Sequence, residues 1–173
     1  MGPFSINKNK LIFKIESLLQ ELFPINRSLT GNGNRDTLNI LNEIVPLNFH
    51  EIPSGEKVYD WKIPKEWNVR KAYIKNEKGE KIVDYSKNNL HLVNYSVPIK
   101  KELSFKELEP HLHTLKDQPK AIPYRTSYYN KSWGFCIEYE KYQKLNKNEN
   151  YEVFIDTDLI DGSLTYADCI IRG

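Results

Sequence analysis

The sequence predicts an α+β fold in which two helices come first and a mostly antiparallel β-rich unit follows. Before Pro46, apolar residues recur every three or four positions, which is the spacing of amphipathic helices. After Pro46, short runs of β-branched and aromatic residues alternate with Gly, Pro and Asn, a pattern typical of strands joined by turns. With 173 residues, of which 39% are hydrophobic and 12% aromatic, the chain can bury a core.

The two predicted helices are separated by a glycine-containing loop. The first covers residues 8–23 and ends at a proline, and the second begins near Asn34 and stops at Pro46. Gly31 and Gly33 resemble a phosphate-binding loop, but no strand precedes them and the third glycine of the dinucleotide fingerprint is absent. We interpret the two glycines as a turn into the second helix.

An anion site at this loop stays open as an alternative. Arg27, Arg35 and the free N–H groups at the start of the second helix could together hold an anion.

The section after Pro46 is predicted to be mainly strand, and we expect residues 51–120 to form the β-rich unit. The predicted strands are residues 47–52, 58–63, 69–75, 81–85 and 90–99. Ser104 and Glu107 form a capping box, which predicts a helix that Pro110 keeps short or bends.

The last section is predicted to contain a helix and two strands. The helix covers residues 138–145, and the strands cover residues 151–156 and 163–171. Asp161-Gly162 is expected to turn the chain between the two strands, as in a hairpin.

Charge and cysteine content exclude several classes of protein. The net charge is +2, with 25 basic and 23 acidic residues interleaved, so we expect neither nucleic acid nor a membrane as a partner. No signal peptide or membrane-spanning run is evident, which makes a cytoplasmic location the expectation. Cys136 and Cys169 are too few for a disulfide framework, and we interpret Cys136 as a buried thiol rather than a nucleophile.

No complete metal or catalytic set is evident. His111 and His113 lie two residues apart without a third ligand, and we interpret them as an exposed helix end. Asp156, Asp158 and Asp161 lack the remaining positions of a calcium loop, so we interpret them as carboxylates beside a turn.

The stretch IPYRTSYYNKSWGFC, residues 122–136, is the densest group of aromatic and polar side chains. Aromatic rings offer flat surfaces whose polar ends need partners when they are buried. This mixture suits either a wall that faces a ligand or a tightly packed structural corner.

Several motifs resemble a bacterial family of aminopeptidase-like proteins related to zinc exopeptidases and often encoded in surface-polysaccharide loci. They are ELFPINRSLTGNGNRDTL, HEIPSGEKVYDWKIPKEWNVRKAYI, LHLVNYSVPI, DQPKAIPYRTSYYNKSWGFC and YEVFIDTDLIDGSLTYAD. The resemblance implies an α/β aminopeptidase-like domain that a β-rich domain of unknown function interrupts. Residues 1–50 would be its N-terminal helices, 51–120 the insert, and 121–173 the returning, incomplete part of the aminopeptidase-like domain.

The family's zinc-binding His, Asp and Glu motifs come in a continuation that this sequence does not contain. The resemblance therefore implies zinc in the complete protein and no metal ligand in this chain, which alone would be inactive. The apolar residues 167–171 lead us to expect that the remainder of the domain, beyond residue 173, covers this edge.

By the same resemblance, two segments, residues 27–35 and 124–133, would frame the substrate through Arg and Tyr donors, with a role in an interdomain contact as the alternative. The residues expected to do so are Arg27, Arg35, Tyr124, Arg125, Ser127, Tyr128 and Trp133. Two alternatives stay open: a structural remnant, and a non-catalytic module that binds a sugar or peptide on an aromatic platform. The platform residues would be Trp61, Trp67, Tyr124, Tyr128 and Trp133.

Overall fold

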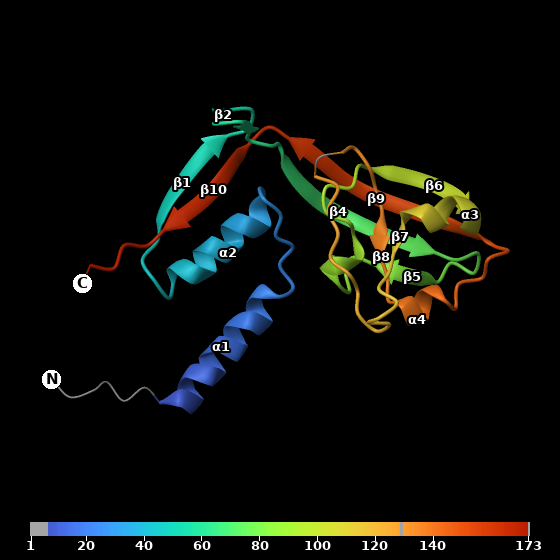
Figure 1. The fold of residues 1–173 in the computed structure, drawn as a ribbon, viewed down its shortest axis with the longest axis horizontal. Helices are drawn as coiled ribbons and strands as arrows, with labels where there is room; N and C mark the ends of the chain where they lie inside the picture. The colour runs from blue at the N-terminus through green and yellow to red at the C-terminus, as the bar shows by residue number, and fades with distance from the viewer. Residues whose placement is uncertain (1–6, 129, 173) are drawn as a thin grey trace.

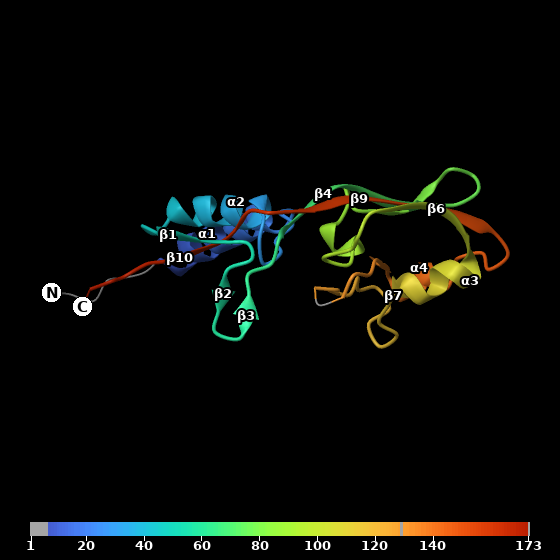
Figure 2. The same cartoon turned by 90° about the horizontal axis from the view of Figure 1, so that it is seen from above.

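The computed structural model describes residues 7–128 and 130–172, which form two parts joined by two neighbouring chain segments (Figure 1). One part holds two long helices and a two-stranded ribbon, and the other is a four-stranded sheet with short helices on one face (Figures 1 and 2). The predicted α+β class is confirmed. The helices are α1 (Lys8–Leu22), α2 (Asn32–Asn42), α3 (Phe105–Leu108) and α4 (Tyr139–Tyr142), with 3-10 turns η1 (Asn89–His91) and η2 (Glu109–His111).

The strands make four small sheets, of which the largest has the order β5-β4-β9-β6 and is antiparallel throughout. Strand β1 pairs with β10, β2 with β3, and β7 with β8. The strands are β1 (Asn48–Pro53), β2 (Lys57–Val58), β3 (Trp61–Lys62), β4 (Glu66–Lys75), β5 (Lys81–Asp84), β6 (Ile99–Ser104), β7 (Leu112–His113), β8 (Phe135–Cys136), β9 (Asn150–Ile160) and β10 (Ser163–Asp168).

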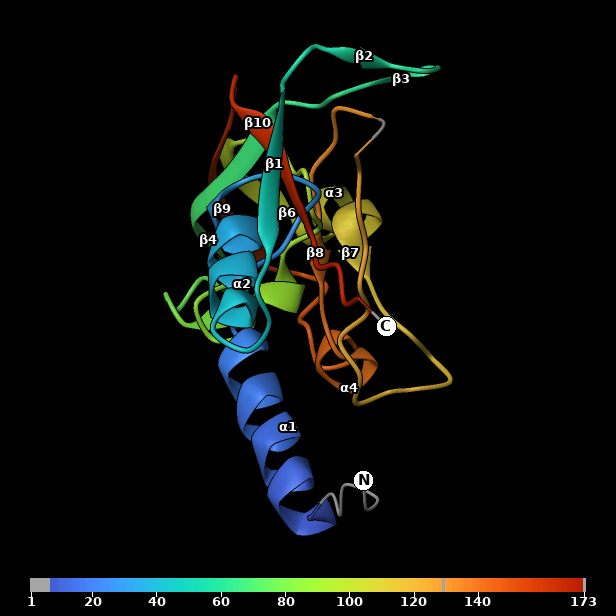
Figure 3. The same ribbon diagram turned by 90° about the vertical axis from the view of Figure 1, so that its left-hand side faces the viewer.

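The two predicted N-terminal helices are confirmed as α1 and α2. Asn7 caps α1 by accepting a hydrogen bond from the Lys10 N–H at 3.2 Å. None of the residues of α1 is buried, and its apolar stripe faces outward, with Leu19 61% exposed. Figure 3 shows α1 extending away from the rest of the chain. The amphipathic pattern therefore describes a helix whose apolar side is largely exposed among the described residues, with only Leu18 and Leu22 half-buried.

The glycines between α1 and α2 shape the turn, as the sequence predicts. Gly31 is the residue before the helix and has φ of 104°, in the region that favours glycine. Gly33 lies so close to the preceding loop that a Cβ atom there would be 2.0 Å from the Asn26 carbonyl oxygen. The chain can enter α2 at this angle only because both positions lack a side chain.

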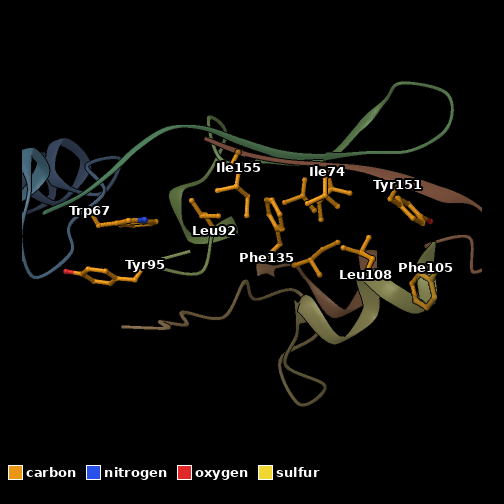
Figure 4. Close-up of a cluster of buried hydrophobic side chains, with 13 residues drawn as sticks. Trp67, Ile74, Leu92, Tyr95, Phe105, Leu108, Phe135, Tyr151 and Ile155 are labelled. Carbon is orange, nitrogen blue, oxygen red and sulfur yellow. The ribbon is translucent and has the colours of Figure 1, made fainter. Parts of the chain in front are cut away.

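One face of the four-stranded sheet carries the core (Figure 4). In β9 the buried residues alternate with half-exposed ones, which is the period of a strand with one buried face. The segments that carry α3, α4, β7 and β8 cover this face (Figure 2). The capping box at the start of α3 is confirmed, since the Ser104 N–H donates to Glu107 Oε2 at 2.9 Å. The most deeply buried large side chains are Tyr151, Phe135, Ile74, Leu92, Leu108, Ile137, Val83 and Val153.

Two predicted strands are wrong. In place of a strand over 58–63, residues 57–62 form the short ladder β2–β3, because Tyr59 adopts a left-handed φ of 56° and turns the chain. Residues 90–99 begin as η1 and continue irregularly, because Asn88 caps the Leu90 N–H at 3.0 Å and Tyr95 has φ of 66°. The predicted helix over 138–145 is shorter than expected and forms α4 alone.

The predicted final hairpin is also wrong, because β10 pairs with β1 and not with β9. Between β9 and β10 the chain does not fold back on itself but continues from one part of the molecule to the other (Figure 1). Glu66 Oε1 accepts the Ser163 N–H at 2.9 Å, and Gly162 O accepts the Ser54 N–H at 2.8 Å. These contacts hold the segment against β1 and the start of β4.

The four-stranded sheet contains strands from two of the predicted segments. Strands β4 and β6 lie within residues 51–120, and β9, which lies between them in the sheet, is within residues 121–173. The division at residues 50 and 120 stays a prediction. Within residues 7–128 and 130–172, no helix has both the length and the apolar character needed to cross a membrane.

Candidate functional site

A groove of about 420 Å³ lies between the α1–α2 loop and the extended segment at residues 124–128. The loop contributes Arg27, Ser28 and Leu29 to its wall. Figure 1 shows the segment, in orange, running along the margin of the sheet part that faces the helices. The remaining lining residues are Asn94, Tyr95, Tyr124, Thr126 and Tyr128.

Backbone pairing with Asn94 holds residues 125–127, and a turn closed by the Asn130 N–H and the Ser127 carbonyl oxygen at 3.0 Å follows at Tyr128. The Asn94 N–H donates to the Arg125 carbonyl oxygen, and the Ser127 N–H donates to the Asn94 carbonyl oxygen, both at 2.9 Å. Alternate side chains of an extended segment face the same side. Tyr124 and Thr126 therefore line the groove from the same side, and Tyr128, at the start of the turn, lines it with them.

Aromatic contacts hold the far end of the groove. The Tyr95 ring stacks on Trp67 with centroids 5.5 Å apart and meets the Tyr128 ring edge-on at 5.2 Å. Trp61 Nε1, from β3, donates to the Tyr128 hydroxyl at 2.8 Å. Since each ring has a fixed neighbour, this wall is organised without a ligand.

Polar groups converge at the other end. Asn94 is only 5% exposed, and its Nδ2 lies 3.4 Å from the Tyr124 hydroxyl. Arg27 Nη1 donates to the Leu22 carbonyl oxygen at 2.7 Å, which ties the guanidinium to the end of α1. The groove thus combines aromatic surface, an amide, hydroxyls and one cation, which suits an anionic or peptide-like ligand better than a purely apolar one.

The structure brings together some of the residues expected to frame a substrate. Arg27, Tyr124 and Tyr128 line the groove, and Ser127 lines an adjoining hollow of about 240 Å³ that shares Tyr95 and Tyr128 with it.

Three expected residues lie elsewhere. Arg35 donates hydrogen bonds from both Nη1 and Nη2 to the Glu66 carboxylate. Trp133 stacks on His111 with centroids 3.6 Å apart, and Arg125 does not line the groove.

Sequence reasoning missed most of the other lining residues. Asn94 and Tyr95 lie in a section predicted to be a strand, where only the tertiary contact with residues 124–128 reveals their position. The alternation Tyr124-x-Thr126-x-Tyr128 could have indicated the shared face. Trp67 was expected in the alternative of an aromatic platform, but it is buried. Its side chain is 3% exposed and donates its Nε1–H to the Ser96 carbonyl oxygen at 3.1 Å.

The described residues contain no group of three or more His, Cys, Asp or Glu positioned to hold a metal ion. His111 and His113 are half-buried rather than exposed, and His111 contacts the Trp133 carbonyl oxygen at 2.9 Å. Asp156 and Asp158 both bind Arg70, and the hydrogen bonds from Arg70 lower the pKa of Asp156. These carboxylates form an ion-pair network on the sheet.

Cys136 is a buried thiol in β8, as the sequence predicts. Burial raises its pKa to about 12. His91 reaches the Cys136 backbone carbonyl oxygen with Nδ1 at 2.7 Å, so this imidazole nitrogen does not pair with the sulfur. A thiol with such a pKa is protonated at neutral pH and is a poor nucleophile.

We therefore expect one of the two cysteines to react with a thiol reagent in the folded chain. Cys169 is partly accessible and should be labelled, whereas Cys136 should react only after denaturation. Ellman's reagent with and without guanidinium measures both. A Cys169→Ser variant that still reacted rapidly when folded would contradict the assignment.

Comparison with known proteins agrees with the resemblance read from the sequence. A protein of Clostridium acetobutylicum described as "Putative polysaccharide biosynthesis protein with aminopeptidase-like domain" is 51% identical over 160 residues. That alignment covers 92% of this chain and 37% of the relative. A crystal structure described as a "putative peptidase" from the same species superposes with a TM-score of 0.88 at 49% identity.

The crystal structure is matched over 93% of this chain and 38% of its own length, so the chain spans less than two fifths of both relatives. Both comparisons confirm the recognition of aminopeptidase-like proteins. Residues 66–158, which run from β4 to β9, match the family described as "Domain of unknown function (DUF2172)". Since this match covers more than half of the sequence, the chain belongs to the DUF2172 family.

Proposed function

We propose that this chain is the N-terminal portion of a zinc-dependent aminopeptidase-like protein linked to surface-polysaccharide biosynthesis, and that it frames the substrate. The groove between Arg27 and residues 124–128 is the observation that carries the proposal. It lies where the helical part and the DUF2172 sheet meet, so that both parts contribute donors to one surface. Arg and Tyr donors at such a surface can orient a carboxylate or stabilise an oxyanion.

The described residues do not fit a zinc centre, because they offer no three-ligand group. In this proposal the zinc ligands come from other segments of the complete protein. The contribution of this chain is positioning: Arg27 supplies positive charge, and Tyr124 and Asn94 supply a hydroxyl and an amide.

We also propose that the remainder of the aminopeptidase-like domain packs on α1 and α2. The apolar side chains of α1 are uncovered, and a groove of about 630 Å³ runs between α1 and the side chains of Ile40 and Ile44. Exposed apolar patches of this kind mark interaction surfaces. The exposed side chains on α1 include Leu11, Ile12, Phe13, Ile15 and Leu19.

The test is the intact mass of the native protein purified from its source cells, with zinc content and aminopeptidase activity measured on the same sample. We expect a mass well above 20.4 kDa, bound zinc, and release of N-terminal amino acids from peptides. A metal-free native protein of 20.4 kDa would overturn the proposal. That outcome would favour the alternative of a non-catalytic module that binds a sugar or peptide.

A substitution in the same native protein tests the framing role. Arg27→Gln should lower kcat/KM about tenfold, because a charged hydrogen bond to the substrate is lost. Lys120→Gln removes the same charge from an exposed position outside the groove and should leave kcat/KM unchanged. Equal kcat/KM for the two variants would contradict substrate framing by Arg27.

A further inference from the structure

We propose that the groove binds a short extended peptide that pairs with the backbone of Thr126 and places a carboxylate against Arg27. The inference rests on the proposed function, since it names the class of substrate that the framing surface takes. Pairing with a free strand edge would supply affinity, and the groove would supply contacts to alternate side chains.

The edge at Thr126 follows from the hydrogen-bond pattern. Asn94 uses both its N–H and its carbonyl oxygen to bind residues 125 and 127. In this parallel bridge the N–H and carbonyl of Thr126 point away from Asn94. Among residues 7–128 and 130–172, neither group has a hydrogen-bond partner, and Thr126 is exposed.

The segment lies at the outside of a small array. On the side of residues 92–97 that faces away from this segment, the N–H groups of residues 93 and 97 donate to the carbonyl oxygens of Gly134 and Ser132, at 3.1 and 2.9 Å. Residues 92–97 are therefore bonded to Ser132 and Gly134 on one side and, through Asn94, to residues 125 and 127 on the other, whereas the outer backbone groups of Thr126 have no partner among residues 7–128 and 130–172. The unpaired side is where an added strand would bind.

The side chains on one face of the segment prepare a matching surface. Tyr124, Thr126 and Tyr128 repeat every second residue, which is also the repeat of an extended peptide beside them. Asn94 is only 5% exposed and still lines the groove, so a buried amide forms part of its lining. A peptide in this register would direct alternate side chains into the groove.

Arg27 gives the surface its charge preference. Its guanidinium has five N–H donors, and the bond to the Leu22 carbonyl oxygen uses one of them. The remaining donors can form a fork with a carboxylate. A free peptide C-terminus or an acidic side chain would supply that group.

A carbohydrate fits these observations less well. Sugar hydroxyls could meet Asn94 and the tyrosines, but a sugar ring does not present N–H and C=O groups at the repeat of the Thr126 edge. The combination of an unpaired backbone edge with a side-chain repeat of two favours a peptide.

Nuclear magnetic resonance of the ¹⁵N-labelled 173-residue chain tests the proposal with trialanine as the probe. We expect trialanine to shift the Thr126 amide signal and the indole signal of Trp61, which bonds to Tyr128. The Trp133 indole, which stacks on His111, should not move. Trialanine amide lacks the carboxylate and should bind at least about tenfold more weakly.

Two pairs of variants locate the contacts. Thr126→Pro removes the free N–H and should weaken trialanine binding at least about tenfold, whereas Thr126→Ser keeps both the N–H and the hydroxyl and should bind normally. Arg27→Gln should weaken binding to the same extent, and Lys120→Gln should not. Since Arg27 is exposed, its variant keeps the test valid if Thr126→Pro fails to fold.

Trialanine that shifted neither signal, or that bound equally well to all four variants, would overturn the proposal. Binding of digalacturonate without binding of trialanine would also overturn it and would assign the groove to acidic carbohydrate. The zinc and activity measurements on the native protein are independent of these results. An active zinc protein whose DUF2172 segment ignored trialanine would retain the proposed function and lose only this inference.

Discussion

Replacement of Gly33 by alanine is expected to destabilise the chain by about 3 kcal/mol. Alanine normally stabilises a helix relative to glycine, by about 1 kcal/mol. Here the added Cβ would lie 2.0 Å from the Asn26 carbonyl oxygen and 3.2 Å from the Ile25 side chain. Because the nearest atom belongs to the backbone, either the loop or α2 must move. Urea denaturation followed by circular dichroism measures the free energy of unfolding.

Asn39→Ala is the matched control for this variant, since Asn39 lies on the exposed side of the same helix. Its free energy of unfolding should stay within about 0.5 kcal/mol of the original chain. If Gly33→Ala were as stable as Asn39→Ala, the close approach of the loop to α2 would be wrong.

Replacement of Glu66 by alanine is expected to cost about 2–3 kcal/mol. Glu66 is 5% exposed and accepts hydrogen bonds from Arg35 Nη1 at 2.8 Å, Arg35 Nη2 at 2.7 Å and the Ser163 N–H at 2.9 Å. Truncation would leave a partly buried guanidinium and a backbone N–H without their acceptor. Thermal and urea unfolding should both report the loss.

The neighbouring residue provides the control for Glu66. Lys65 pairs with Asp161 at 3.0 Å, but the two side chains are 53% and 77% exposed. Exposed ion pairs contribute little, so Lys65→Ala should change the free energy of unfolding by no more than about 0.5 kcal/mol. Equal effects at residues 65 and 66 would contradict a special role for the buried pair.

The Arg35–Glu66 pair predicts a dependence of stability on pH. The Arg35 hydrogen bond lowers the pKa of Glu66 below its ordinary value of 4.5. A lowered pKa in the folded state means that the ionised carboxylate stabilises the fold above 4.5, and that this stabilisation is lost as pH falls through the folded-state pKa. The stability difference between the original chain and Glu66→Gln should be constant near neutral pH and should shrink below 4.5. A difference that did not change with pH would show that charge is not involved.

Local patterns in the sequence predicted most of the helices and several strands. The apolar repeat before Phe23 and the Ser104–Glu107 capping box both depend on residues at most four positions apart, and both are confirmed. The prediction of a strand at 90–99 was wrong because Tyr95 has a left-handed backbone conformation, which a tyrosine in the sequence does not indicate.

Long-range pairing was harder to predict. Asp161-Gly162 has the composition of a hairpin turn, yet β10 pairs with β1 instead of β9, and the Ser163 N–H donates to Glu66, nearly a hundred residues earlier. The groove shows the same limit. Residues on both sides of it were expected to frame a substrate, but the position of Asn94 between them depends on tertiary contacts that the sequence does not reveal. The pairing of Arg35 with Glu66 was not expected either, because no local pattern in the sequence distinguishes a free guanidinium from a paired one; the framing role of Arg35 stays a prediction.

The ladder between β1 and β10 imposes an order on folding. Its strands meet across a long stretch of chain, with Ser54 and Gly162 separated by 108 residues. Strand β1 is synthesised early and must wait for β10, while the sheet of β4, β5, β6 and β9 can form from the residues between them.

Once that sheet has formed, β4 and β9 hold the two crossing segments side by side, and the loop that remains to be closed shrinks to roughly a dozen residues. This lowers the entropic cost of joining β1 to β10 by about 2 kcal/mol. The inserted sheet thus acts as an internal folding template for the part of the chain that surrounds it.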